Sequence, residues 1–352
     1  MAYLDLTNVC KNFNNVVAVK DFTLPIEKGQ LVSFLGPSGC GKTTTLRMIA
    51  GFEIPDSGSI LLDGMDISNV PPNKRGIGMV FQAYALFPNM TILENIMFGL
   101  KMQHKPKEFS EKKAMEMLDL VRLANTAKRY PHQLSGGQQQ RIALARAIAI
   151  EPHVLLLDEP LSALDAEVRV VLRGEIRRIQ TDLGITTVYV THDQEEALSI
   201  SDEVVVMNGG LIEQIGTPQQ IYRKPNTRFV ATFIGTANEF HGVVTGANSA
   251  SCDGMAVISE NLQPFPNGTH VVILVRPENV EVFDGKPIEQ RSNLFEGEIE
   301  TLTFHGATTR LGIISDGKHI TADINQTGRP MLKHHQRVWL SFRPEYCQVM
   351  PE

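Results

Sequence analysis

The chain has 352 residues, a length typical of one large domain followed by a smaller one. Hydrophobic residues make up 42% and charged residues 20%, an ordinary globular composition that excludes fibrous and disordered classes. The formal net charge of -6 provides no global basic field, so no nucleic-acid partner is expected. The four cysteines are Cys10, Cys40, Cys252 and Cys347. They show no paired spacing, so neither a disulfide framework nor a zinc site is expected.

No apolar run approaches the roughly 20 residues that a membrane-spanning helix needs. The N-terminal segment carries Asp5 and has no basic stretch followed by an apolar one, so we do not expect a secretory signal. We therefore expect a protein of the reducing cytosol. If it acts at a membrane, another chain must cross the bilayer.

Short apolar runs alternate with helical patterns through the first part of the chain. The runs that predict strands are 31–35, 77–81, 154–157, 188–190 and 204–207. Helices are predicted where apolar residues recur every three or four positions, at 44–50, 114–121, 142–148 and 164–179. Continuously apolar strands separated by helices predict a largely parallel α/β core.

A glycine-rich loop follows the first of these strands. Its residues, Gly36-Pro37-Ser38-Gly39-Cys40-Gly41-Lys42-Thr43, fit the phosphate-binding pattern GxxxxGK[ST], and Thr44 opens the helix after it. Such a loop lets backbone N–H groups wrap a phosphate at a helix N-terminus. Lys42 would contact the β- and γ-phosphates, and the Thr43 hydroxyl would bind Mg²⁺. For Cys40 we weigh a redox role against simple tolerance of the loop geometry, and favour the second.

Two acids and a histidine end later strands. Asp158 and Glu159 follow 154–157, and His192 follows 188–190. Two acids after a strand are more often a solvated edge, and a lone histidine there is usually structural. Beside a phosphate loop, we expect Asp158 to hold Mg²⁺ and Glu159 to activate a water molecule. His192 could donate a hydrogen bond to a γ-phosphate.

The chain changes character after about residue 236. Short alternating runs such as 271–275 and 338–342, broken by Gly, Pro and Asn, predict an all-β module. This module contains a faint repeat, in which 238–244 resembles 293–299 and 275–278 resembles 342–345. Two copies of one β unit are therefore expected.

The segment Leu134-Ser135-Gly136-Gly137-Gln138-Gln139-Gln140-Arg141 resembles the signature motif of ABC ATPases, and all the motifs occur in that family's order. The resemblance is dense over residues 3–235. It assigns Gln82 to the Q-loop, which contacts Mg²⁺ and the partner. It assigns Glu159, His192 and Gln82 to catalysis. It assigns Phe13 to adenine stacking, where the family more often has tyrosine, and Asp165 to the D-loop. Nucleotide contacts are also implied for Ser135, Gly136, Gly137 and Gln138.

The resemblance implies a P-loop NTPase domain at 1–236, with a helical subdomain at about 85–150. A small OB-like TOBE domain is expected at 237–352. In this family the signature of one copy contacts the nucleotide of the other, which implies a homodimer that closes around two ATP molecules with Mg²⁺. The segment 84–88 is interpreted either as core or as part of a groove for a permease helix.

The resemblance further implies a bacterial solute importer at the cytoplasmic face of the cell membrane, with permease subunits and an extracytoplasmic solute-binding protein. The short tail favours ferric iron as the solute. Polyamine, phosphonate, hexose-phosphate and sugar importers stay open. A soluble ABC protein of translation or DNA repair and a P-loop kinase are the competing classes.

Overall fold

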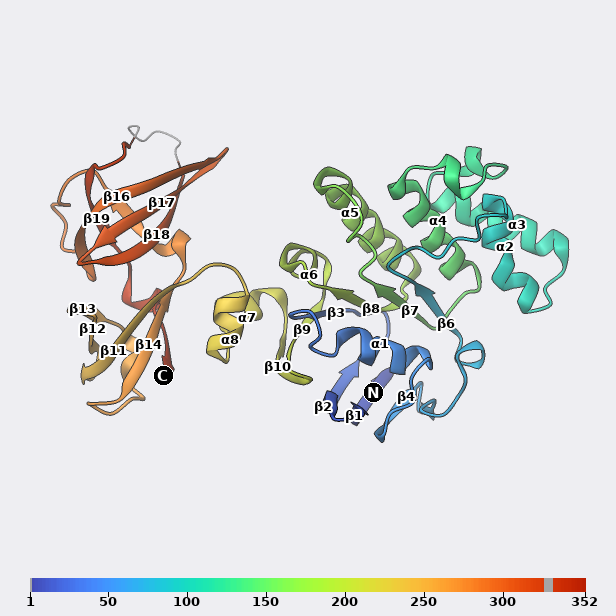
Figure 1. The fold of residues 1–352 in the computed structure, drawn as a ribbon, viewed down its shortest axis with the longest axis horizontal. Coiled ribbons are helices and arrows are strands. Elements are labelled where there is room, and N and C mark those ends of the chain that lie inside the picture. The colour runs from blue at the N-terminus through green and yellow to red at the C-terminus, as the bar shows by residue number, and fades with distance from the viewer. Residues whose placement is uncertain (1, 326–331) are drawn as a thin grey trace. The chain divides into compact units, whose positions relative to one another are not determined.

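The computed structural model describes residues 2–325 and 332–352. Packing divides the chain into two units, Met1–Arg223 and Lys224–Glu352 (Figure 1). This division lies before the expected boundary after residue 236 because helix α8 (Arg228–Phe233) packs on the second unit. Its Ala231 is buried with Val272, Leu274 and Met350.

A six-stranded sheet forms the centre of the first unit. Its order is β10 (Leu211–Gly216), β9 (Glu203–Asn208), β3 (Leu31–Leu35), β8 (Thr186–Thr191), β7 (Val154–Asp158) and β6 (Ile77–Val80). All neighbours are parallel except β9 and β10. The five predicted strands are therefore present and make the predicted parallel core. Because parallel strands end at one edge, Leu35, Asp158 and Thr191 lie at that edge.

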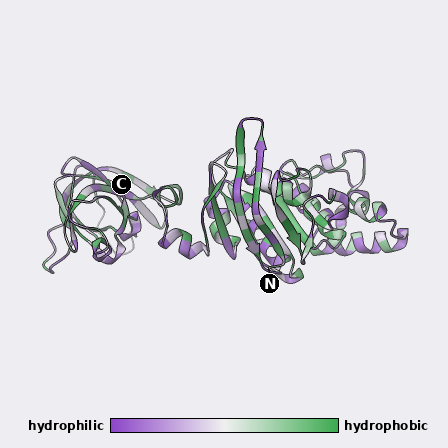
Figure 2. Cartoon of the chain, turned by 90° about the horizontal axis from the view of Figure 1, so that it is seen from below, coloured by the Kyte–Doolittle hydropathy of each residue, from purple (hydrophilic) through white to green (hydrophobic). Residues whose placement is uncertain are grey.

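A second, antiparallel sheet was not predicted. Its order is β2 (Val16–Ile26), β1 (Leu4–Phe13), β4 (Ser57–Leu62) and β5 (Met65–Asp66). One face of this sheet is buried, and Leu4, Leu6, Phe22 and Leu24 pack against Phe34 and the helix after β3. Buried and exposed residues consequently alternate in β2 from Phe22 to Ile26. Figure 2 shows hydrophilic and hydrophobic residues mixed along the strands of the chain.

Seven helices of the first unit surround these sheets. They are α1 (Lys42–Ala50), α2 (Ile92–Met102), α3 (Lys107–Leu120), α4 (Gly136–Ala149), α5 (Ala166–Leu183), α6 (Gln194–Ile200) and α7 (Pro218–Arg223). Side-chain caps fix the starts of several of these helices, among them Thr91 for α2, Ser135 for α4, Asp165 for α5 and Asp193 for α6. Among the described residues, no helix is both long and apolar enough to cross a bilayer.

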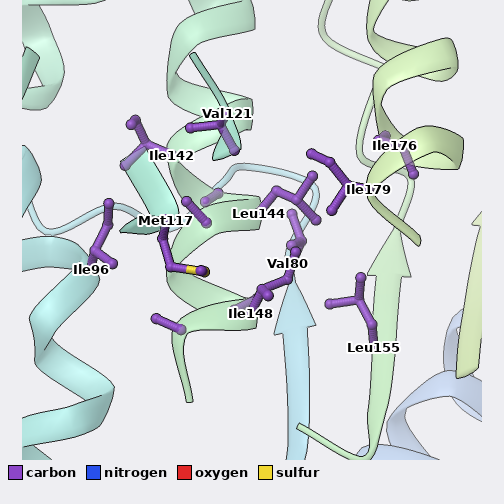
Figure 3. Close-up of a cluster of buried hydrophobic side chains, with 14 of the residues drawn as sticks. Val80, Ile96, Met117, Val121, Ile142, Leu144, Ile148, Leu155, Ile176 and Ile179 are labelled. Carbon is purple, nitrogen blue, oxygen red and sulfur yellow. The ribbon is translucent and has the colours of Figure 1, made fainter. Parts of the chain in front are cut away.

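Helix α4 lies at the centre of a large apolar core. Its Ile142, Leu144 and Ile148 are buried together with Ile96 of α2 and Met117 of α3 (Figure 3). The same cluster includes Val80 of β6, Leu155 of β7 and Ile176 and Ile179 of α5. Helices α2–α4, which fall inside the expected helical subdomain, are thus packed on the strands that carry the site residues.

Outside 326–331, the second unit is all-β apart from α8 and short 3₁₀ turns, as expected. One sheet has the order β13 (Met255–Ile258), β12 (Ser249–Cys252), β11 (Asn238–Gly246), β14 (His270–Val275) and β20 (Gln348–Pro351). The other has the order β15 (Glu281–Phe283), β19 (Arg337–Ser341), β16 (Leu294–His305), β17 (Thr308–Ser315) and β18 (Lys318–Asn325). A single apolar core with Phe240, Ile299 and Phe342 joins the two sheets.

The repeated asparagines tie the two sheets together in reciprocal fashion. The Asn238 side chain accepts from the N–H of Thr321 (2.7 Å) and donates to its carbonyl (2.8 Å). The Asn293 side chain does the same with Ile258 (2.6 and 2.9 Å) and also donates to the carbonyl of Phe342 (3.1 Å). Each repeat therefore clamps a strand of the opposite sheet, which gives the predicted repeat a physical reason.

Candidate active site

The loop between β3 and α1 is shaped by glycines. A Cβ on Gly36 would lie 2.2 Å from the carbonyl oxygen of Met207, and one on Gly41 would lie 2.4 Å from that of Ala18. Gly39 and Gly41 also have left-handed backbones, with φ of 80° and 103°. Because the atoms that a Cβ on Gly36 or Gly41 would meet are backbone atoms, both of these positions require glycine. Within the described chain, α1 has no side-chain cap, so its first N–H groups can bind an anion.

The lysine of the loop is buried against it. The Nζ of Lys42 donates to the carbonyl oxygens of Gly36 (2.7 Å) and Pro37 (2.9 Å). Ser38 is exposed and Thr44 half-buried. Burial raises the pKa of the Cys40 thiol, and the opposing charge of Lys42 only partly offsets it. A protonated thiol is a poor nucleophile, so this environment agrees with a packing role for Cys40 better than with a redox role.

A hydroxyl and a carboxylate meet beside the loop. The Oγ1 of Thr43 donates to Oδ1 of Asp158 at 3.3 Å. Burial raises the pKa of Asp158, while the Thr43 hydrogen bond lowers it in part. A buried carboxylate with a hydroxyl neighbour offers oxygen ligands of the kind that a hard divalent cation prefers.

Glu159 lies between the predicted glutamine and the predicted histidine. Its Oε2 accepts from Nε2 of Gln82 (3.2 Å) and lies 3.2 Å from Nδ1 of His192. Glu159 has a left-handed backbone with φ of 43°, and its N–H donates to the carbonyl of Val190 (3.0 Å). A non-glycine residue in this region carries strain, and such strain concentrates at active sites. The turn brings Glu159 to the end of the neighbouring strand β8, where its carboxylate lies beside His192.

Comparison with known proteins agrees with this geometry. Residues 19–162 match the ABC transporter family model, and residues 273–350 match the TOBE domain. The chain is 46% identical over 363 aligned positions to the spermidine/putrescine import ATP-binding protein PotA of Thermobifida fusca, covering 99% of this chain and 93% of that protein. It is 48% identical to the sulfate/thiosulfate import ATP-binding protein CysA 2 of Chromobacterium violaceum, covering 90% and 85%.

Two solved structures of ATP-binding cassette proteins are also similar to this chain over about three fifths of its length. A dimeric, post-hydrolysis structure of the ATP-binding cassette MJ0796 with ADP and Pi has a TM-score of 0.55 and 32% identity, covering 61% of this chain and 98% of that one. The cbiO1 protein of Clostridium perfringens has a TM-score of 0.59 and 29% identity, covering 62% and 90%.

The chain is an ABC transporter ATPase with a TOBE domain. As a member of this family it binds ATP and hydrolyses it, which confirms the predicted family, fold class and enzyme class.

The ABC signature segment begins α4. The Ser135 Oγ accepts from the N–H of Gln138 (3.4 Å), whose side chain accepts from the Ser135 N–H (3.0 Å). A Cβ on Gly136 would lie 3.0 Å from Leu164, and one on Gly137 2.9 Å from Val168. Among the described residues, no hydrogen bond or ion pair joins Ser135–Gln138 to the phosphate loop. Within the described residues, no polar interaction of this kind therefore links the two predicted phosphate-binding elements.

Two further predicted residues lie outside the phosphate loop. The ring of Phe13 is exposed at the end of β1, with Nζ of Lys11 5.3 Å from its centroid. An exposed ring face is available for stacking. Asp165 caps α5 by accepting from the N–H of Val168 (2.9 Å), so its carboxylate already has a structural partner.

Two features of the site were missed by sequence reasoning. Glu196 is buried and accepts from the hydroxyls of Tyr189 (2.8 Å) and Thr191 (2.8 Å), which holds the strand end before His192. Arg75 is buried and donates to the last carbonyls of α1, those of Met48 (2.7 Å) and Ile49 (2.8 Å). No local pattern marks either residue, because both act through contacts that a single sequence does not display.

Proposed function

We propose that two copies of this chain close around two ATP molecules and that this closure drives solute import through permease subunits. The observation that carries the proposal is the position of Glu159, whose carboxylate lies between Gln82 and His192 beside the Thr43–Asp158 pair. A carboxylate placed this way can accept a proton from a water molecule that attacks the γ-phosphate.

The other residues have distinct roles in this mechanism. The backbone from Gly36 to Gly41 and the ammonium group of Lys42 bind the phosphates, and Phe13 stacks on the adenine. His192 donates a hydrogen bond to the γ-phosphate and registers its loss. Thr43, Asp158 and Gln82 would hold Mg²⁺, which neutralises phosphate charge when it is bound.

The signature of the second copy would complete each site. Within the described chain, no hydrogen bond or ion pair joins Ser135 and the N-terminus of α4 to the phosphate loop, and the related MJ0796 cassette was solved as a dimer. Ser135, Gly136, Gly137 and Gln138 would then bind the γ-phosphate held by the partner, with Asp165 at the boundary between copies. A single copy would hydrolyse ATP poorly.

The membrane partner is inferred from the family. The relatives are named as import ATP-binding proteins, so we place this chain at the cytoplasmic face of a bacterial membrane, bound to permease subunits. An extracytoplasmic solute-binding protein would deliver the solute to these subunits. Tyr84 is buried and belongs to the core, whereas Phe81 is exposed 6.0 Å from Phe52, so these two rings are the better candidates for permease contact.

The solute is best supported as a polyamine. The tail favours ferric iron in the sequence, but the similar proteins reported above are named for polyamines and for sulfate. Since the solute passes through the permease, this chain supplies only indirect information. ATP-dependent uptake of radiolabelled spermidine, sulfate and ferric ion into vesicles that hold the assembled transporter decides between these solutes. Uptake of iron without spermidine would overturn the polyamine assignment.

The decisive test of the ATPase site is Glu159→Gln. The amide keeps the shape but cannot accept a proton, so ATP hydrolysis falls by about 10²–10⁴-fold. Because ATP is still bound, size-exclusion chromatography with ATP and Mg²⁺ shows a stable dimer. Glu195→Gln makes the same chemical change at an exposed position on α6 and serves as the control. Hydrolysis at the normal rate by Glu159→Gln would remove Glu159 from the role of base.

A further inference from the structure

Arg146 links the signature helix to the turn that follows Gln82. It lies near the C-terminal end of α4, and its guanidinium donates to the carbonyl oxygens of Ala85 (2.7 Å) and Tyr84 (3.0 Å). The same group lies 5.5 Å from the ring centroid of Phe87. Burial lowers the pKa of Arg146, but a guanidinium stays charged at neutral pH. The fork of an arginine fits two adjacent carbonyls in a way that a lysine does not.

The turn that Arg146 holds is strained. Tyr84 and Ala85 are consecutive non-glycine residues with left-handed backbones, at φ of 59° and 49°. The turn has short local hydrogen bonds, from Tyr84 N–H to Phe81 O (2.8 Å) and from Ala85 N–H to Ala83 O (2.6 Å). Such a conformation persists only where surrounding contacts impose it. The two bonds from Arg146 end on the carbonyls of the two strained residues.

Both ends of this segment are fixed to different parts of the unit. On one side, Gln82 donates to Glu159 (3.2 Å) and to Oγ of Ser162 (3.4 Å). On the other side, the Asn95 side chain of α2 accepts from the N–H of Phe87 (2.8 Å) and donates to its carbonyl (3.1 Å). The strained turn is thus the connection between the catalytic carboxylate and the helices.

We propose that Arg146 is a positioning residue that makes the Q-loop turn and the signature helix move as one body. Helix α4 is capped by Ser135, and its Ile142, Leu144 and Ile148 are buried in the apolar core (Figure 3). Because the helix is held as one rigid element, a displacement at its N-terminus is transmitted along it. Arg146 passes that displacement to Tyr84 and Ala85, and hence to Gln82 and Glu159. Engagement of Ser135 by nucleotide on the partner would then align the catalytic pair. The inference rests on the proposed function of Gln82.

Arg146→Lys tests the link because a lysine keeps the charge but not the fork. We expect kcat for permease-stimulated ATP hydrolysis to fall by about tenfold or more, as misplacement of a catalytic pair does, with KM for ATP unchanged. Hydrogen exchange at residues 84–87 should become faster. Arg178→Lys is the matched control, since Arg178 on α5 also donates to a carbonyl, that of Leu120 (3.1 Å), and pairs with Asp182.

A rescue separates positioning from general stability. Ala85→Gly should restore part of kcat in the Arg146→Lys background, because glycine adopts the left-handed conformation freely. It also provides a second variant if Arg146→Lys alone folds poorly. In the Gln82→Ala background, Arg146→Lys should cause no further fall in kcat, since both changes act on the same contact.

The outcomes distinguish this inference from the function on which it rests. Equal falls in Arg146→Lys and Arg178→Lys, or a full additional fall in the Gln82→Ala background, would overturn the positioning role. Normal turnover by Arg146→Lys beside an impaired Gln82→Ala would overturn the link alone. Normal turnover by Gln82→Ala would remove the catalytic role of Gln82, and the inference with it.

Discussion

The two buried asparagines of the second unit and the two carboxylates of the site in the first unit are in opposite situations. In the second unit, Asn238 and Asn293 are buried and their amides bond backbone groups of the opposite sheet. In the first unit, Asp158 is buried with a raised pKa, and Glu159 has a strained backbone. The two asparagines fix one packing arrangement of their unit, whereas Asp158 and Glu159 are held in unfavourable states.

This difference follows from what each unit has to do. A fully satisfied buried amide stabilises and specifies a fold, while a destabilised group at a site gains its partner only when ligand binds. Substitutions at three residues test the contrast, one residue in the second unit and two in the first.

The largest effect is expected for Asn293→Ala. Three backbone groups, the N–H and carbonyl of Ile258 and the carbonyl of Phe342, lose their partner in the interior. The free energy of unfolding of the second unit should fall by about 3 kcal/mol, measured by urea denaturation followed through Trp339 fluorescence. Asn267→Ala, at an exposed position, is the control. A loss no greater than that of the control would show that the clamp is not stabilising.

A smaller effect distinguishes Glu159→Gly from Glu159→Ala. Both variants lose the carboxylate, but only glycine adopts the observed φ of 43° without strain. The glycine variant should therefore be more stable by about 1 kcal/mol, measured by thermal unfolding of the nucleotide-free protein. An alanine variant as stable as the glycine variant would mean that no strain is stored at this residue.

The smallest effect is expected for Asp158→Asn. Burial raises the pKa of Asp158 in the folded chain, so its carboxyl contributes stability at low pH that is lost as pH rises through the folded pKa. Asparagine avoids this loss and should give a slightly higher Tm at neutral pH without divalent cation. The advantage should shrink as pH falls toward the ordinary Asp pKa of about 3.9. Asp119→Asn, an exposed control, should show no such trend.

Much of the first unit could be predicted because its signals are local. The five apolar runs mark the parallel strands, and the GxxxxGK[ST] pattern needs a strand before it and a helix after it, both of which are present. The same holds for Ser135, whose cap sets the start of α4. The antiparallel sheet of β1, β2, β4 and β5 could not be predicted, because its strands are half-exposed and the pairing of β1 with β4 joins segments that are far apart in the sequence.

The site was predicted as a set of residues and not as an arrangement. The identity of Glu159, Gln82 and His192 came from motif order, but their contact depends on a left-handed turn that sequence patterns do not reveal. The role of Arg146 could not be predicted from its place in an apolar helix, because its partners are backbone carbonyls about sixty positions away. In the second unit the repeat could be recognised in the sequence. Its structural role became clear only from the hydrogen bonds that Asn238 and Asn293 make with backbone groups of the opposite sheet.

The last strand of the chain also constrains how the protein is made. Strand β20 pairs with β14 at one edge of its sheet, and the N–H of Glu352 bonds the carbonyl of His270 (3.3 Å). The second unit thus lacks this edge strand until β20 has been synthesised, whereas every strand of the first unit is made earlier. During synthesis the first unit can therefore fold before the second unit has all its strands.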